Sequence, residues 1–358
     1  MLCHIAKRSL ICLLTIPTIS AAIFAQNTPR ESLLILSKQD HTVAIVDPAT
    51  LKVITKIPVG NDPHEVIASS DGNTAYVSNY GGGAYNTLTV VDVTLQTPLN
   101  TIDLGPLRGP HGLDFAGGKV WFTAEAAKAI GSYDPASSKV DWILGTGQDR
   151  THMIYVAPGL ERIVTTNVNS GTVSIIERSG VRATDGPPAN SPNPQQGTAT
   201  GPPPEPPHTD WTETVVKVGN GSEGFDVSRD GKEFWVANAQ DGTISIIDFA
   251  QKKVTQTLAA NVRGANRLKF TPDGKLVLVS SLRGPDVVVF DAANRREAKR
   301  IPVGHGAAGI QMQPDGSRAF VACTPDNYVA AIDLKSLQVT DHIDAGHQPD
   351  GMAWAGHR

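Results

Sequence analysis

Three histidines and one glutamate occupy corresponding places in four consecutive segments of the sequence. His64, His111, His152 and Glu223 each enter a short apolar segment soon after a glycine. Imidazole nitrogens and carboxylate oxygens are the ligands that zinc, copper, iron and manganese take in proteins. The pattern therefore predicts a site for one divalent transition-metal ion, zinc or copper rather than magnesium, because nitrogen ligands outnumber oxygen ligands.

Other polar residues accompany this set, either in the same loops or at the same places of later segments. They are Arg108, Arg150, Asn266, Arg267 and Asp350. The arginines would make the site less negative and could hold an anionic substrate. The alternative for the whole set is a polar pore that orders water and binds no ligand. The sequence assigns a catalytic role to none of these residues.

Several well-known chemical motifs are missing from the sequence. The glycine-rich run at 81–85 lacks the following helix that phosphate binding needs, so no nucleotide cofactor is expected. The sequence has neither the Gly-x-Ser-x-Gly motif of serine hydrolases nor the Cys-x-x-Cys-His motif of covalently bound haem.

A repeat accounts for the spacing of these residues. In each copy an apolar strand is followed by a short polar gap and then by another strand, which ends in an acidic residue and a turn. The apolar strands that open the seven copies are LLILS (33–37), AYVSN (75–79), WFTAE (121–125), IVTTN (163–167), FWVAN (234–238), LVLVSS (276–281) and AFVAC (319–323). The acidic residues are Asp47, Asp92, Asp134, Glu177, Asp248, Asp291 and Asp333. All but one of the intervals match the roughly 40–45 residues of a four-stranded propeller blade.

The phase of the repeat predicts how the ring closes. The chain begins with the second strand of a blade and ends, at 350–355, with a segment typical of a first strand. The C-terminal strand should therefore join the N-terminal blade and remove the last free sheet edge. The predicted fold is all-β, a seven-bladed β-propeller of four-stranded antiparallel blades. The candidate ligands then enter the innermost strands at the mouth of the axial channel.

Two longer copies of the repeat, at 59–79 and 218–238, resemble the YVTN β-propeller repeat family of exported bacterial and archaeal proteins. The resemblance covers about residues 33–355 and implies the fold rather than an activity. The run RGPHGLDFAGGKVWFTAE (108–125) also resembles streptogramin lyases, which implies a metal site of His and Glu at the channel mouth. This second resemblance is too local to assign individual catalytic residues.

Residues 1–25 are predicted to be a secretory signal peptide that precedes a single domain over 26–358. Lys7 and Arg8 come before an apolar stretch that is too short to span a membrane, and Ala25 is the expected cleavage point. We therefore expect an exported protein, periplasmic or extracellular, with no transmembrane segment after cleavage. The net charge is −4, and loss of Lys7 and Arg8 changes it to −6, which argues against a nucleic-acid partner.

One insertion interrupts the repeat between the third and fourth strands of a blade. Residues 179–210 are rich in proline, glycine and polar side chains and have almost no apolar ones, so a disordered loop is predicted. The alternative is a lid or a docking segment that uses the proline-rich run at 202–207.

These observations support three functions. The first is an extracytoplasmic binding or scaffold protein that receives an unidentified small molecule or protein in its axial funnel. The second is a metal-dependent lyase or lactonase, in which the ion polarises an ester carbonyl and one histidine acts as a general base. The third is a cell-surface interaction protein that makes its contact through the insertion.

Overall fold

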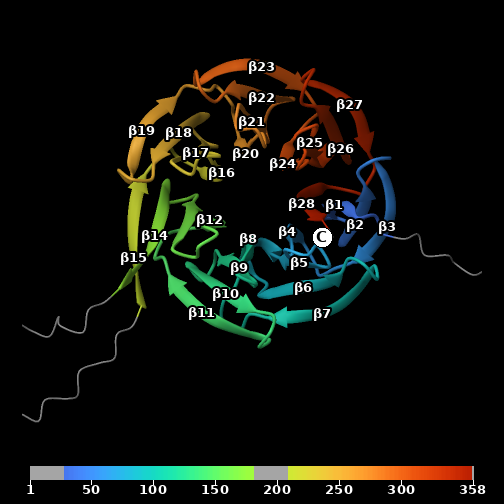
Figure 1. Ribbon diagram of the computed structural model, residues 1–358, viewed down its shortest axis with the longest axis horizontal. Helices are drawn as coiled ribbons and strands as arrows, with labels where there is room; N and C mark the ends of the chain where they lie inside the picture. The colour runs from blue at the N-terminus through green and yellow to red at the C-terminus, as the bar shows by residue number, and fades with distance from the viewer. Residues whose placement is uncertain (1–27, 181–208, 357–358) are drawn as a thin grey trace, which may run out of the picture.

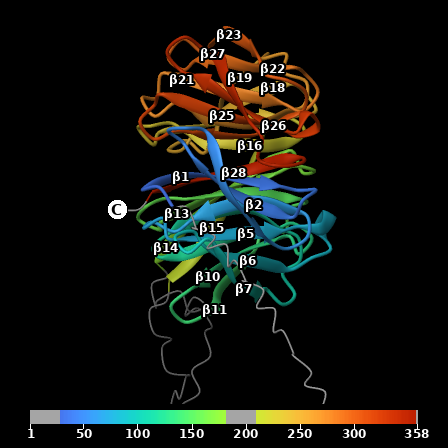
Figure 2. The ribbon, with the colours of Figure 1, turned by 90° about the vertical axis from the view of Figure 1, so that its right-hand side faces the viewer.

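The apolar segments predicted as strands form seven four-stranded antiparallel sheets in the computed structural model, which describes residues 28–180 and 209–356. The sheets follow one another around a central axis in chain order (Figure 1), and Figure 2 shows the same ring from its edge. This arrangement confirms the predicted seven-bladed β-propeller.

Each blade contributes one strand to each of four concentric layers. The innermost strands are β28 (Pro349–Gly356), β4 (Pro63–Ala68), β8 (Pro110–Ala116), β12 (Thr151–Val156), β16 (Ser222–Val227), β20 (Ala265–Phe270) and β24 (Ala307–Met312). The second strands are β1 (Glu31–Ser37), β5 (Thr74–Asn79), β9 (Lys119–Ala124), β13 (Arg162–Asn167), β17 (Glu233–Asn238), β21 (Leu276–Ser281) and β25 (Arg318–Cys323).

The outer two layers have the same regularity. The third strands are β2 (Thr42–Asp47), β6 (Thr87–Asp92), β10 (Ala129–Asp134), β14 (Thr172–Gly180), β18 (Thr243–Asp248), β22 (Asp286–Asp291) and β26 (Tyr328–Asp333). The outermost strands are β3 (Lys52–Pro58), β7 (Thr97–Asp103), β11 (Lys139–Gly145), β15 (Thr209–Lys217), β19 (Lys253–Leu258), β23 (Arg296–Pro302) and β27 (Gln338–Ile343). The helical elements in the described parts of the chain are two short 3-10 turns, η1 (Gly81–Gly83) and η2 (Thr324–Asp326), and neither could cross a membrane.

The second strands are apolar on both faces because each blade is covered by a neighbour on either side. In β1, Leu33 and Ile35 belong to one buried cluster with Phe320 of the preceding blade, whereas Leu34 packs with Val66 of the following blade. Burial on both faces explains why these strands read as unbroken hydrophobic runs rather than as alternating ones.

The C-terminal strand closes the ring as predicted. Strand β28 pairs antiparallel with β1, with Trp354 opposite Leu33 and Met352 opposite Ile35. The first and last blades of the sequence therefore become neighbours in Figure 1.

In six of the seven blades the third strand ends in an aspartate that holds the following turn, whereas Glu177 lies within β14 and pairs with Arg162 and Lys252. The Oδ1 atom of Asp47 accepts a hydrogen bond from the Ala49 N–H at 2.9 Å, and Asp134 receives the same bond from Ala136 at 2.9 Å. These carboxylates hold turns on the outside of the ring, so they do not form a chemical site.

The insertion is shorter than the sequence suggested. Ser179 and Gly180 continue β14 and pair with Asp210 and Thr209 of β15, because the hairpin ladder extends past the end of the blade. The predicted range 179–210 therefore narrows by two residues at each end, and the rest of it lies outside the described residues. The predicted signal peptide, 1–25, also lies outside them.

Candidate functional site

The site is built from a bulge that occurs in all seven innermost strands. In each one, pairing with the second strand is interrupted between the first and fourth residues. A bulge bends a strand and redirects its side chains, here toward the axis. The second residues of these strands are His64, His111, His152, Glu223, Asn266, Ala308 and Asp350, and all seven line one axial funnel of about 350 Å³.

Hydroxyl groups of the second strands hold the bulges in place. Thr123 accepts a hydrogen bond from the Gly112 N–H at 2.9 Å and donates one to the His152 carbonyl at 2.8 Å. Thr166 likewise donates to the Glu223 carbonyl at 2.6 Å. Each bulge is thereby tied to the entry residue of the next blade. Gly112 permits this close approach, because a Cβ there would lie 2.4 Å from the His152 carbonyl oxygen.

The three histidines form a row of neighbouring rings. The ring centroids of His64 and His111 are 5.0 Å apart, and those of His111 and His152 are 3.9 Å apart. Burial, together with the charge of His152, holds the pKa of His111 well below its usual value. Its Nδ1 atom is buried and has no hydrogen-bond partner. His111 therefore presents a neutral imidazole, which is the form that binds metals.

Two carboxylates hold His152. Its Nδ1 lies 2.5 Å from Glu125 Oε1, and its Nε2 lies 2.8 Å from Glu223 Oε2. Burial opposes protonation of this ring, but the two carboxylates outweigh burial and raise the pKa of His152. Burial likewise opposes ionisation of Glu223, yet His152 and Arg150 lower its pKa to about 2.

Glu125 was not among the residues singled out from the sequence, although it lies at the centre of the site. The Tyr80 hydroxyl donates a hydrogen bond to it, and the Arg150 Nε lies 3.5 Å from its Oε1. Tyr80 and Glu125 both follow directly after the second strand of their blade. Other residues at this position also line the funnel, namely Lys38, Leu282 and Thr324. The residue after each second strand was thus the signal that could have revealed Glu125.

Among the residues that the structure describes, one group of side chains could hold a metal ion. His111, Glu125 and His152 are buried, and each offers a ligand atom within 4.8 Å of the others. His64, which the sequence placed in this set, has other partners. Its Nε2 lies 3.2 Å from Asp62 and its Nδ1 lies 3.6 Å from Asp350, which in turn lies 3.3 Å from the Lys38 Nζ.

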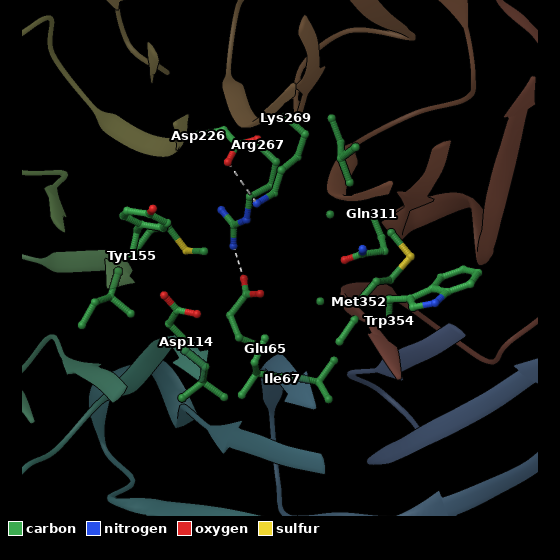
Figure 3. Close-up of a pocket in the computed structure, with 18 of the residues that line it drawn as sticks. Glu65, Ile67, Asp114, Tyr155, Asp226, Arg267, Lys269, Gln311, Met352 and Trp354 are labelled. Atoms are coloured by element: carbon green, nitrogen blue, oxygen red, sulfur yellow. Dashed lines mark hydrogen bonds and ion pairs between the residues drawn. The ribbon is translucent and has the colours of Figure 1, made fainter. Parts of the chain in front are cut away.

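The remaining predicted residues divide between the funnel, its floor and the surface. Asn266 and Arg150 line the funnel. Arg267 is buried and forms an ion pair with Glu65 across the axis, as Figure 3 shows. The sequence placed Arg108 in the funnel, but its side chain is exposed and does not line the funnel, so this prediction is corrected. It lies in the connection between β7 and β8, where its N–H bonds to the Pro106 carbonyl at 3.0 Å.

Comparisons with known proteins agree with this fold and leave the family open, since no protein-family model matches the chain. Antigen Lp49 of Leptospira interrogans is 24% identical over 150 residues, which are 36% of this chain and 33% of that protein. The match thus spans about a third of that relative's length.

Solved structures resemble the chain over the whole ring. A functionally unknown protein from Desulfotomaculum acetoxidans superposes with a TM-score of 0.70 at 15% identity, covering 90% of this chain and 98% of that one. A candidate 6-phosphogluconolactonase from Bacteroides fragilis superposes with a TM-score of 0.68 at 17% identity, covering 92% and 99%. At such identities the likeness concerns the fold alone.

Proposed function

We propose that this protein is a binding protein whose axial funnel holds one divalent transition-metal ion, zinc or copper. The observation that carries the proposal is the buried group of His111, Glu125 and His152, whose ligand atoms all lie within 4.8 Å of one another. Two imidazole nitrogens and one carboxylate oxygen make a ligand set that suits these metals. The unpartnered Nδ1 of His111 is a buried acceptor that an ion would satisfy.

The charge of the funnel supports a divalent cation. Four carboxylates, Asp62, Glu125, Glu223 and Asp350, face two permanent cations, Lys38 and Arg150, while Glu65 and Arg267 neutralise each other. With neutral imidazoles the funnel therefore carries two uncompensated negative charges. Protons on histidines can offset them at low pH, and a divalent ion would offset them at neutral pH.

The neighbours of the proposed ligands fit the role of outer partners. Glu223 accepts from His152 Nε2, so that Nδ1 remains on the side of Glu125. Tyr80 donates to Glu125 and fixes its orientation. Such partners raise metal affinity about 10–100-fold by orienting the ligands.

Zinc titration of protein lacking residues 1–25 and any histidine tag tests the proposal. Isothermal titration calorimetry at pH 7.5 should show one site, confirmed by elemental analysis after dialysis. His111→Ala should weaken binding by more than the roughly 100-fold that an outer partner can contribute. His305→Ala is the matched control, because this side chain is 78% exposed and lies outside the funnel. A protein that takes up no zinc or copper, or a His111→Ala variant that binds normally, would refute it.

A metal-dependent lyase or lactonase is the second candidate. The funnel volume of about 350 Å³ leaves room for a small substrate beside the ion, and the fold resembles that of candidate 6-phosphogluconolactonases. The ion would polarise the carbonyl, and His64, whose ring lies 5.0 Å from that of His111, would be available as the general base. Hydrolysis of sugar lactones by the zinc-loaded protein, and its loss in His111→Ala, would favour this candidate over simple binding.

We further propose that the chain is an exported protein of the YVTN repeat type, cleaved after Ala25. The repeats and the apolar N-terminal stretch support this view, and a partial relative is named as an antigen. Cell fractionation with N-terminal sequencing of the exported form is the test. A cytoplasmic, uncleaved protein would contradict it. A third candidate, an interaction protein that docks through 179–210, predicts a partner that is lost when this segment is deleted.

A further inference from the structure

A second cavity, of about 280 Å³, lies on the other side of the floor of the funnel. The ion pair between Glu65 and Arg267 spans the axis (Figure 3) and lies between the residues that line the two spaces. The second cavity is lined by residues further along the same innermost strands, and none of the proposed metal ligands is among them. Arg267, in the floor, lines both spaces, so the floor is the element that they share.

At one level of this cavity, five neighbouring blades contribute polar side chains. The fifth residues of five consecutive innermost strands are Asp114, Tyr155, Asp226, Lys269 and Gln311, and all of them line the cavity. The remaining two blades place Ala353 and Ile67 at the same level. Figure 3 shows Asp114, Tyr155 and Asp226 along the left side of the space and Trp354 on the right. The ionisable side chains at this level thus come from β8 to β20, whereas β28 and β4 contribute apolar side chains there.

The two aspartates differ in how many of their carboxylate oxygens accept hydrogen bonds from the protein. Asp114 accepts the Phe115 N–H at 2.8 Å with one oxygen and the Val156 N–H at 2.7 Å with the other. Asp226 accepts the Phe270 N–H at 2.9 Å through Oδ2 alone. Its Oδ1 lies 3.8 Å from the Lys269 Nζ, which is too far for a hydrogen bond. Asp226 therefore keeps an oxygen that a ligand can use.

The charge of the cavity calls for a cation. Burial raises the pKa of Asp114, although two backbone N–H groups favour its ionised form. When Asp114 and Asp226 are both ionised, Lys269 compensates one of the two charges, because Glu65 and Arg267 neutralise each other. One negative charge is left over. Burial, and next the charges of the two aspartates, raise the pKa of Tyr155, so its hydroxyl keeps its proton and the uncharged ring can contribute to binding a cation.

We propose that the second cavity binds a small organic monocation, an ammonium group carried on an apolar body. The ammonium group would lie between Asp226, Asp114 and the Tyr155 ring. The apolar body would contact Met352 and Trp354, which line the opposite side of the same space. Such a division between a few polar groups and a hydrophobic wall is typical of small-molecule sites.

The first experiment compares three probes of one shape and different charge, namely 2-phenylethylamine, 2-phenylethanol and phenylacetate. Titration calorimetry at pH 7.5 in the presence of EDTA should show that the amine binds at least about tenfold more tightly than the alcohol, as expected for hydrogen bonds to a charged group. Phenylacetate should bind more weakly than either. Equal affinities for the amine and the alcohol would overturn the proposal.

Variants locate the ammonium site. Asp226→Asn keeps an oxygen for the Phe270 N–H but loses the charge, and it should weaken amine binding by about tenfold or more. Asp341→Asn, on the outermost strand β27, is the control and should bind normally. Lys269→Met removes the cation that competes for Asp226 and should tighten amine binding severalfold. This variant tests the proposal even if Asp226→Asn folds poorly. His111→Ala should leave amine binding unchanged. A Lys269→Met variant that binds no more tightly would refute the proposed position.

Discussion

Breaking the ion pair at the floor of the funnel should destabilise the whole ring. Glu65 and Arg267 are carried by β4 and β20, which lie across the axis from each other, and their side chains are only 11% and 8% exposed. Arg267→Met leaves the buried Glu65 carboxylate without its partner. Removing one member of a buried pair costs about 3–5 kcal/mol of the free energy of unfolding.

The matched double variant separates the cost of the orphaned charge from the value of the pair. Glu65→Leu combined with Arg267→Met removes both charges and fills the space with apolar side chains, so its stability should return to that of the wild type or exceed it by up to about 4 kcal/mol. Equilibrium urea unfolding in the presence of EDTA measures these differences without a contribution from bound metal.

A surface pair serves as the control for this measurement. Lys232 and Asp230 are 80% and 55% exposed, so Lys232→Met should change the free energy of unfolding by no more than about 1 kcal/mol. If Arg267→Met cost as little as Lys232→Met, or if the double variant were less stable than both single variants, the channel would be well hydrated and the reasoning would fail.

Three further predictions concern closure, the thiol and pH. Truncation after Gln348 removes β28 and should cost several kcal/mol, because Met352 and Ala353 are buried; an unchanged melting temperature would contradict ring closure by this strand. Burial raises the pKa of Cys323 to about 12, so iodoacetamide at pH 8 should label it only after unfolding, and labelling of the native protein would show an open blade. The raised pKa of His152 means that its proton stabilises the metal-free fold fully below pH about 6.5, and that this contribution is lost as pH rises through the folded pKa. Thermal melts in EDTA should show this loss, and Glu223→Gln should reduce it.

The blades and the closure of the ring were predictable because they depend on local patterns. Unbroken apolar runs mark strands that are covered on both faces, and an acidic residue at a strand end marks a turn. The entry positions of the innermost strands could be aligned for the same reason, so that His64, His111 and His152 were placed in one funnel.

The place of Glu125 in the site could not be predicted, because the alignment of the repeats was uncertain by one residue at this point. The pattern aligned it with Asn79, the last residue of a second strand. The observed register pairs Asn79 with Pro63 but pairs Ala124, not Glu125, with Pro110. Glu125 thus corresponds to the residue after the strand, which faces the funnel. A single step of register changes the direction of a side chain, and apolar runs do not specify it.

The partners of His64 could not be foreseen either, because they depend on distances across blades. Asp62 precedes it in the same loop, whereas Asp350 comes from the strand that closes the ring. Equivalent positions place imidazoles side by side, but the nearest carboxylate determines where each ring turns. The sequence therefore predicted which residues gather in the funnel and could not predict how they pair.

The third residue of the bulge explains why the axis holds two separate spaces. In four blades this residue is glycine, and a Cβ there would lie within 2.4 Å of the backbone of the next blade. The positions are Gly112, Gly224, Gly309 and Gly351. Among the remaining three blades, two carry the long charged side chains Glu65 and Arg267, which meet across the axis. Because each would be an unpaired buried charge without the other, both must be present for the floor to exist. One ring of seven equivalent positions thus separates the funnel, with its proposed metal ligands, from the second cavity, for which we propose a different ligand.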